Sequence, residues 1–284
     1  MATSDASFRR RKFIDALARW TCFAMVLLAL LPLGSILFDL VKKGFAGFNW
    51  AFFTQLPKPV GETGGGMANA FVGSGILVGL GCLFGIPLGV LGGVYLSEFG
   101  GNRFGKAVRF AADVMSGVPS IIAGIFVYGF MVLSMKRFSA LAGGVALAVL
   151  MLPTIMRTTE ELLKLVPDSL REAGLALGIP KWRVILGVVL RTGAPGIATG
   201  IMLAVARAAG ETAPLLFTAF GSRFLSFKLD QPMGSLPVQI YTYAVSPYED
   251  WHQQAWAAAL ALVLGILVVN VLARVLTRPI GQGR

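Results

Sequence analysis

Six long apolar segments limit the folds that this chain can adopt. They lie at roughly residues 21–40, 67–96, 111–135, 140–156, 197–220 and 255–276. A helix needs about 20 apolar residues to cross the hydrocarbon core of a bilayer. The segments are continuous apolar runs and lack the alternation of polar and apolar residues that marks barrel strands. The sequence therefore predicts an all-α, polytopic membrane protein with six transmembrane helices.

The charges agree with this class and suggest an orientation. Only 14% of the residues are charged and the net charge is +11, whereas a soluble domain carries about a quarter charged residues. Most Lys and Arg side chains lie on the side that holds both termini and the fourth–fifth connection. Because such residues concentrate in cytoplasmic loops, we expect both termini in the cytoplasm. The basic charge then reflects topology, and we expect no nucleic-acid partner.

Four regions follow along the chain. Residues 1–20 form a basic cytoplasmic leader that could hold an interfacial helix, residues 21–66 the first transmembrane helix with an outer loop, residues 67–278 a core of five transmembrane helices, and residues 279–284 a cytoplasmic tail.

Neither cysteine nor histidine points to a metal or catalytic site. Cys22 and Cys82 lie in predicted spans without a CxxC motif and are interpreted as small apolar side chains. His252 has no nearby partner at metal-ligand spacing. An intramembrane enzyme would need a nucleophile with a base, or a metal cluster. We therefore expect no catalytic residues, no metal and no cofactor held by this chain.

The second apolar segment carries a stripe of glycines. They recur at every fourth position, at Gly81, Gly85, Gly89 and Gly93. Such a stripe places one smooth helical face where a second helix can approach closely. We expect tight helix packing there.

The polar connection at residues 158–190 predicts a helix–turn–helix outside the membrane. Pro167 and Asp168 signal a helix start, Gly178 a helix end, and Pro180 the start of a second helix. The connection is either an ordinary solvated linker or a protruding element that docks another protein.

Arg207 and Glu211 stand out in the stretch LAVARAAGETAPLLF, which is otherwise almost wholly apolar. Four residues apart, they share one helical face and can form an ion pair. Near the centre of the predicted fifth span, neither can face lipid. One interpretation is a structural ion pair. The other is an anion path, in which Arg207 attracts the anion, Glu211 weakens that attraction, and Thr212 offers a hydroxyl. Pro214 is expected to kink this span.

Polar residues in the third segment are weaker candidates for a substrate path. They are Asp113, Ser116 and Ser120. We expect them to cap or hinge a helix, since a carboxylate would repel an anion.

The loop at residues 158–190 resembles the EAA motif of binding-protein-dependent ABC importer permeases, written EAA, three residues, Gly, nine residues, I-x-L-P. Glu172, Ala173 and Gly178 occupy matching positions. Gly174 replaces the second alanine, and Arg191 replaces the final proline.

A wider resemblance covers about residues 64–278. Stretches such as DVMSGVPSIIAGIF, ARAAGETAPLLFTA and QPMGSLPVQIYTYAVSPYEDWHQQAWAAAL are similar to PstA-type permeases of bacterial phosphate importers. The resemblance implies a type I ABC importer permease fold in the bacterial inner membrane, and a subunit that forms half of a phosphate pathway. It also implies that the EAA loop docks an ATPase, through the positions Arg171, Glu172, Ala173 and Gly178.

The resemblance implies three kinds of partner: a PstC-type permease, a PstB-type ATPase dimer that holds ATP and Mg²⁺, and a periplasmic PstS-type phosphate-binding protein. This chain has no G-x-x-x-x-G-K-[ST] motif for ATP. A permease for sulfate, molybdate or phosphonate stays open as an alternative, because tetrahedral oxyanions differ mainly in charge and protonation. A passive channel is a third possibility, which would leave the EAA-like loop without a role.

Overall fold

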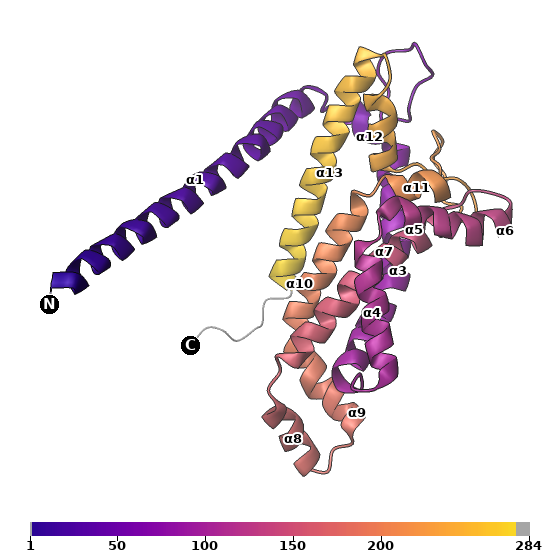
Figure 1. Cartoon of the computed structure of the whole chain (residues 1–284). Helices are drawn as coiled ribbons and strands as arrows, with labels where there is room; N and C mark the ends of the chain where they lie inside the picture. Colours follow the sequence, from indigo (N-terminus) through magenta and orange to yellow (C-terminus); the bar gives the residue numbers. More distant parts are fainter. Residues whose placement is uncertain (1, 277–284) are drawn as a thin grey trace.

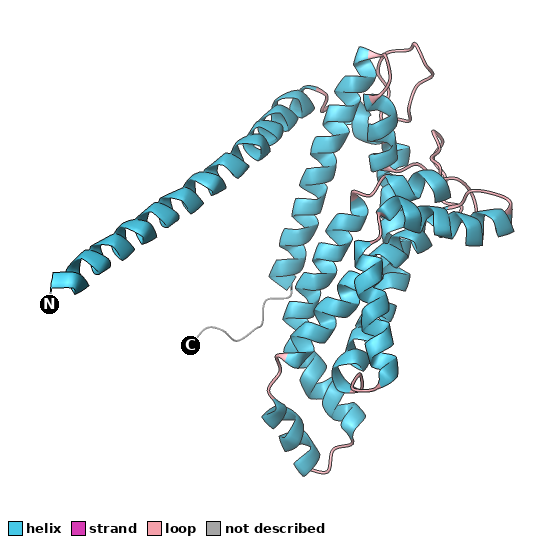
Figure 2. Ribbon diagram, viewed as in Figure 1, coloured by secondary structure: helices cyan, strands magenta, loops and turns pink. Residues whose placement is uncertain are grey.

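The computed structural model describes residues 2–276, which fold into helices joined by loops (Figure 2). The one strand-like pairing in this part of the chain is an isolated bridge between Pro57 and Gly65. Five helices are long and apolar enough to cross a membrane, and the number reaches six if a bent pair counts as one span. The all-α class and the six expected segments are therefore confirmed. The predicted tail at residues 279–284 lies outside the described residues.

The first helix reaches beyond the first predicted span at both ends. Helix α1 runs without a break from Ala2 to Ala46, so the basic leader continues the span and forms no separate interfacial helix. It contacts the rest of the chain mainly through its last turns, which cross α13 (Glu249–Leu276). Elsewhere α1 projects away from the other helices (Figure 1). A short helix, α2 (Trp50–Thr54), follows it.

Helices α3 (Ala68–Glu98) and α7 (Ala140–Lys164) form the centre of the bundle. The glycine stripe of α3 lies against α7, as expected. A Cβ atom on Gly85 would lie 3.3 Å from the Cα of Ala148, and one on Gly93 would lie 2.6 Å from the carbonyl oxygen of Met156. The absence of side chains therefore lets the two backbones approach closely.

The third apolar segment is a broken helix. Helix α4 (Arg103–Gly117) ends before Pro119, and the chain turns by 108° into a second helical arm. That arm consists of α5 (Ser120–Val127), a π-helical turn η1 (Tyr128–Val132) and α6 (Leu133–Met135). The break follows from Pro119, which disfavours the helical conformation of Val118; Val118 has φ −73° and ψ 130°.

The fifth span is displaced from its predicted position of residues 197–220. A helical run of 29 residues extends from Lys181 to Ala209 and ends at Gly210. It comprises α9 (Lys181–Val184), a π-helical turn η2 (Ile185–Val189) and α10 (Leu190–Ala209). The remaining apolar residues form a separate helix, α11 (Ala213–Thr218). Pro214 therefore lies in the first turn of a new helix and does not kink a continuous one.

The two ends of the bundle differ in character (Figure 1). At one end, called here the α12 end, α12 (Leu236–Ala244) packs on the start of α13 and on α2 through an apolar cluster that includes Phe52, Tyr243 and Trp251. At the opposite end, called the α8 end, α8 (Asp168–Ala176) and α9 protrude beyond the other helices.

Candidate functional site

The protruding helix–turn–helix at the α8 end confirms the predicted architecture of residues 158–190. Helix α8 begins at Asp168 and is closed by Gly178, whose φ of +73° suits glycine. The amide of Gly178 donates to the carbonyl of Leu175 at 2.9 Å, and the amide of Ile179 donates to that of Gly174 at 3.3 Å. These two bonds form a Schellman motif, which fixes the turn into α9.

The surface of this helix–turn–helix is exposed and partly apolar. Glu172 and Ala173 lie on it, as the EAA resemblance implies. It also exposes large apolar side chains, namely Leu170, Leu175, Leu177, Ile179 and Trp182. A cluster of exposed apolar groups rimmed by polar ones is typical of a protein-interaction surface. We call Glu172, Ala173 and these five residues the docking face.

Gly174, which departs from the EAA pattern, is explained by packing between α8 and α9. It is buried, and a Cβ atom at this position would lie 2.9 Å from Cγ2 of Val184. Glycine therefore lets α9 lie closer to α8 than alanine would.

The guanidinium of Arg171 turns inward and holds the loop in place. Its Nη2 lies 2.9 Å from Oε1 of Glu98, at the end of α3, and its Nη1 donates to the carbonyl of Val166 at 2.5 Å. The side chains of Arg171 and Glu98 are 18% and 5% exposed. Because Arg171 also caps the carbonyl of Leu163 in α7, it joins α8 to two helices of the bundle.

A second ion-pair network lies beside the Arg171–Glu98 pair, which we call the clamp. The buried carboxylate of Glu160 on α7 accepts hydrogen bonds from Arg109 of α4 and from Lys164, both at 2.5 Å. Arg109 also donates to the carbonyls of Leu96 and Gly100 at the end of α3. The network thus fixes α4 and the end of α3 to α7.

Arg207 and Glu211 contact each other as predicted, at the end of α10. The Arg207 Nε lies 3.5 Å from Oε1 of Glu211, and their side chains are 56% and 15% exposed within the single chain. Arg207 is in the last turn of α10, and not at the centre of a continuous span. A cation is favoured at that position, because the carbonyls at a helix C-terminus carry partial negative charge.

The residues around this pair interrupt the helix. Gly210 ends α10, and Thr212 precedes α11 without capping it through its side chain. Helix α11 packs on the other broken segment, since a Cβ on Gly124 of α5 would lie 2.5 Å from the Cα of Pro214. The arm beyond the first helix break therefore packs on the helix that follows the second break, the one next to Arg207. Non-helical backbone at membrane depth is tolerated where it is buried in protein or lines a water-filled cavity.

The polar residues of the third segment have local roles. Asp113 pairs with Arg157 of α7 at 3.0 Å. The hydroxyl of Ser116 donates to the carbonyl of Ala112, and Ser120 is the first residue of α5. Ser120 therefore lies next to the bend, whereas the contacts of Asp113 and Ser116 do not cap a helix terminus.

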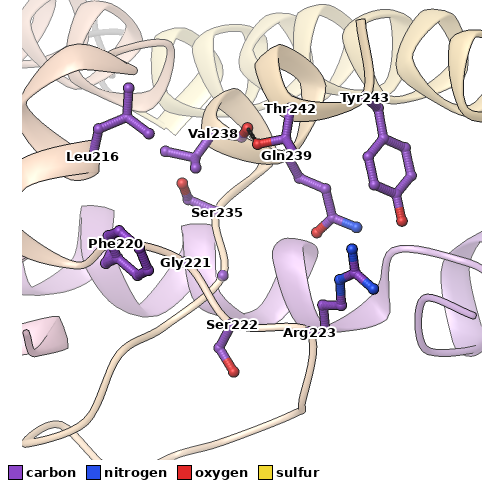
Figure 3. Close-up of a pocket in the computed structure, with 11 residues that line it drawn as sticks. Leu216, Phe220, Gly221, Ser222, Arg223, Ser235, Val238, Gln239, Thr242 and Tyr243 are labelled. Carbon is purple, nitrogen blue, oxygen red and sulfur yellow. Dashed lines mark hydrogen bonds between the residues drawn. The ribbon is translucent and has the colours of Figure 1, made fainter. Parts of the chain in front are cut away.

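Sequence reasoning overlooked Arg223. It lines a pocket of about 360 Å³ at the α12 end, between the segment that follows α11 and one face of α12 (Figure 3). The only signal in the sequence was a basic residue in a polar loop, which does not show that the loop folds back over α12.

Comparison with known sequences identifies a family. The model of the "Binding-protein-dependent transport system inner membrane component" matches residues 85–282. The "Phosphate transport system permease protein PstA" of Yersinia pestis is 46% identical over 95% of this chain and 91% of its own length. The protein of the same name from Haemophilus influenzae is 45% identical over 94% and 95%.

Solved structures share the fold. The bacterial alginate ABC transporter in complex with an alginate-bound periplasmic protein aligns with a TM-score of 0.68 over 94% of this chain and 97% of its own, at 16% identity. An inward-facing MetNI methionine ABC transporter aligns with a TM-score of 0.59 over 76% and 98%, at 20% identity. The chain therefore belongs to the binding-protein-dependent transport system inner membrane components, in the group of PstA-type permeases.

Proposed function

We propose that the chain is the permease subunit of an ATP-driven importer of inorganic phosphate, and that it forms half of the translocation pathway. The observation that carries this proposal is identity above 40% along almost the whole chain to permeases named for phosphate transport. The Arg207–Glu211 pair at the break between α10 and α11 adds a physical basis, because it offers a cation at a place where backbone can line an aqueous path.

The docking face is the proposed binding surface for the ATPase that drives transport. A PstB-type ATPase dimer, which holds ATP and Mg²⁺, binds Glu172, Ala173 and the apolar side chains around Gly178. The α8 end and both termini then lie in the cytoplasm, and this chain itself holds no cofactor. Movement of the docking face passes to the bundle through Arg171, which links α8 to α3 and α7.

At the α12 end, a PstS-type binding protein delivers phosphate, and a PstC-type permease supplies the other half of the path. Arg207 then faces the interface between the two permeases, in keeping with its exposure in the single chain. Five fixed donors make arginine suited to an oxyanion. Glu211 weakens this attraction, which favours release, since conduction requires entry and departure. Thr212 adds a hydroxyl donor.

Uptake of radiolabelled phosphate into proteoliposomes tests this function. The chain is reconstituted with its partner subunits, and wild type is compared with Arg207→Gln. We expect ATP-dependent uptake to fall by at least about 10-fold, as for loss of a charge-assisted hydrogen bond. Arg137→Gln is the control, because Arg137 is equally exposed but pairs with Asp230 elsewhere.

The outcomes separate the alternatives. Uptake of sulfate, molybdate or phosphonate without phosphate would reassign the substrate to another oxyanion. Uptake that needs no ATP would identify a channel. Full activity of Arg207→Gln would leave the ion pair a structural role only and would remove Arg207 from the path.

A separate variant tests docking. Glu172→Ala should reduce the amount of ATPase that co-purifies with the permease, whereas Glu161→Ala, an exposed carboxylate on α7 outside the docking face, should not. Equal recovery of ATPase with both variants would contradict the docking role of Glu172.

A further inference from the structure

The pocket around Arg223 has the composition of an anion site. Its polar side chains come from both sides of one loop: Arg223 at its start, and Ser235, Gln239, Thr242 and Tyr243 at its end and on α12. The α12 residues share one face of that helix, which forms the wall opposite Arg223 (Figure 3).

Two donor groups, the Gln239 amide and the Arg223 guanidinium, converge in the pocket beside the Tyr243 hydroxyl. The Gln239 carbonyl oxygen accepts a hydrogen bond from Nδ2 of Asn69 at 3.3 Å. The Gln239 amide nitrogen therefore points toward the guanidinium of Arg223 (Figure 3). Within residues 2–276 the Arg223 guanidinium has no ion pair; it lies 5.4 Å from the ring centroid of Trp251 and acts electrostatically on the Tyr243 hydroxyl.

Buried hydroxyls add further donors. Ser235 is 2% exposed, and its Oγ, within the described residues, has no hydrogen-bond partner. Tyr243 is 3% exposed and stacks on Trp251 at 4.4 Å. A tyrosine hydroxyl is protonated at neutral pH, and burial raises the pKa of Tyr243 further, so that this hydroxyl can donate to an anion.

The nearby carboxylate is already engaged. Asp250 accepts hydrogen bonds from the amide of Gly64 at 3.3 Å and from Gln254 at 3.1 Å. Both bonds fall on Oδ2, and within the described residues no ion pair joins Asp250 to Arg223, so that the positive charge of Arg223 remains available to an anion.

The pocket also adjoins the proposed path. Helix α11 begins directly after Thr212, and the residues at and beyond its other end, Phe220 and Gly221, line the pocket. Six helical residues span only about 9 Å. The pocket and the Arg207–Glu211 pair thus lie at opposite ends of one short helix.

We infer that this pocket is a second oxyanion site, in which Arg223, Gln239 and Tyr243 hold inorganic phosphate at the α12 end before it reaches Arg207. The inference rests on the proposed function, since phosphate is taken from it. A pocket of about 360 Å³ also leaves space for water around the ion. With Arg223 exposed, binding is weak and reversible, as an entry site requires.

The test measures phosphate binding directly. Purified complex without the binding protein is kept in detergent free of phospholipid, and broadening of the ³¹P NMR line of inorganic phosphate is titrated. Arg223→Gln should weaken the binding by about 10-fold, and Arg223→Lys by less, because the charge stays and the bidentate geometry is lost. Lys228→Gln removes a positive charge from the same loop outside the pocket and should change nothing. Equal broadening in wild type and Arg223→Gln would overturn the site.

Two further arms separate the alternatives. A phospholipid headgroup carries the same chemistry, so binding seen in detergent but abolished in nanodiscs of anionic lipid would assign the pocket to lipid and overturn the entry site. Arg207→Gln should lose uptake and keep the Arg223-dependent broadening. If wild type transports no phosphate but Arg223 still binds it, the transport proposal fails and the binding site stands.

Discussion

At the residue scale, the ion pair of Arg207 and Glu211 illustrates what a sequence can and cannot place. Their spacing predicts the contact, and the structure has it at 3.5 Å. The prediction that one continuous helix holds the pair was wrong, because hydropathy reports apolar character and not the continuity of a helix. Gly210 ends α10 inside the apolar run. The helix terminus contributes its own field to Arg207, which a mid-helix position would not.

Glu211→Gln provides a prediction at this scale. Loss of the carboxylate leaves Arg207 unopposed, so that an oxyanion binds more tightly and leaves more slowly. We expect the maximal rate of phosphate uptake to fall several-fold while the complex still assembles, measured in proteoliposomes at saturating phosphate. An unchanged or higher maximal rate would show that Glu211 does not tune release.

At the element scale, the clamp between Arg171 and Glu98 joins the docking face to the bundle. Breaking a buried pair by removing one partner destabilises by roughly 3–5 kcal/mol, because a charge is left uncompensated. We therefore expect Glu98→Gln to lower the melting temperature of the complex and to reduce uptake more than ATP hydrolysis. The coupling ratio, phosphate taken up per ATP hydrolysed, measures this difference.

A double-mutant cycle serves as its control. The double variant Glu98→Gln with Arg171→Gln should lose less stability than the sum of the losses in the two single variants, since neither charge is then left unpaired. Strict additivity, or a coupling ratio equal to that of wild type in every variant, would contradict the clamp.

The contact between α5 and α11 gives a second prediction for an element. A Cβ on Gly124 meets backbone at Pro214, which cannot move aside as a flexible side chain could. Gly124→Ala should therefore destabilise the complex by about 1–3 kcal/mol, the usual range for overpacking, in thermal denaturation. Gly129→Ala, on the same arm with open space around it, is the matched control. Similar melting temperatures for both variants would argue against the tight contact.

At the scale of the whole molecule, the sequence predicts the helical class, the number of segments, the glycine face of α3 and the turn at Gly178. It does not predict the 108° bend of the third segment or the limits of α10. The first half of the α9–α10 run contains Arg183 and Arg191, so that a search for apolar residues begins too late. The pocket of Arg223 depends on a loop that folds back on α12, a contact that spacing along the chain does not encode.

The attachment of α1 to the rest of the chain depends on its contact with α13 and can be tested. A Cβ on Gly44 would lie 2.7 Å from Cβ of Leu260 and 2.9 Å from the carbonyl of Trp256 in α13. Gly44→Leu should push α1 from α13 and lower the yield of assembled complex by several-fold in size-exclusion chromatography. Gly34→Leu, in the free part of α1 with nothing within 4 Å, should have a smaller effect. The reverse order would contradict this attachment.

The projecting α1 also bears on how the cell treats this subunit. A helix of 45 residues with few contacts to its own chain gains most of its order from lipid and from neighbouring proteins. In a copy made in excess of its partners, α1 therefore stays poorly packed and accessible to membrane proteases. We expect surplus subunit to be degraded soon after synthesis, so that its abundance follows that of the companion permease without any dedicated control of its own gene.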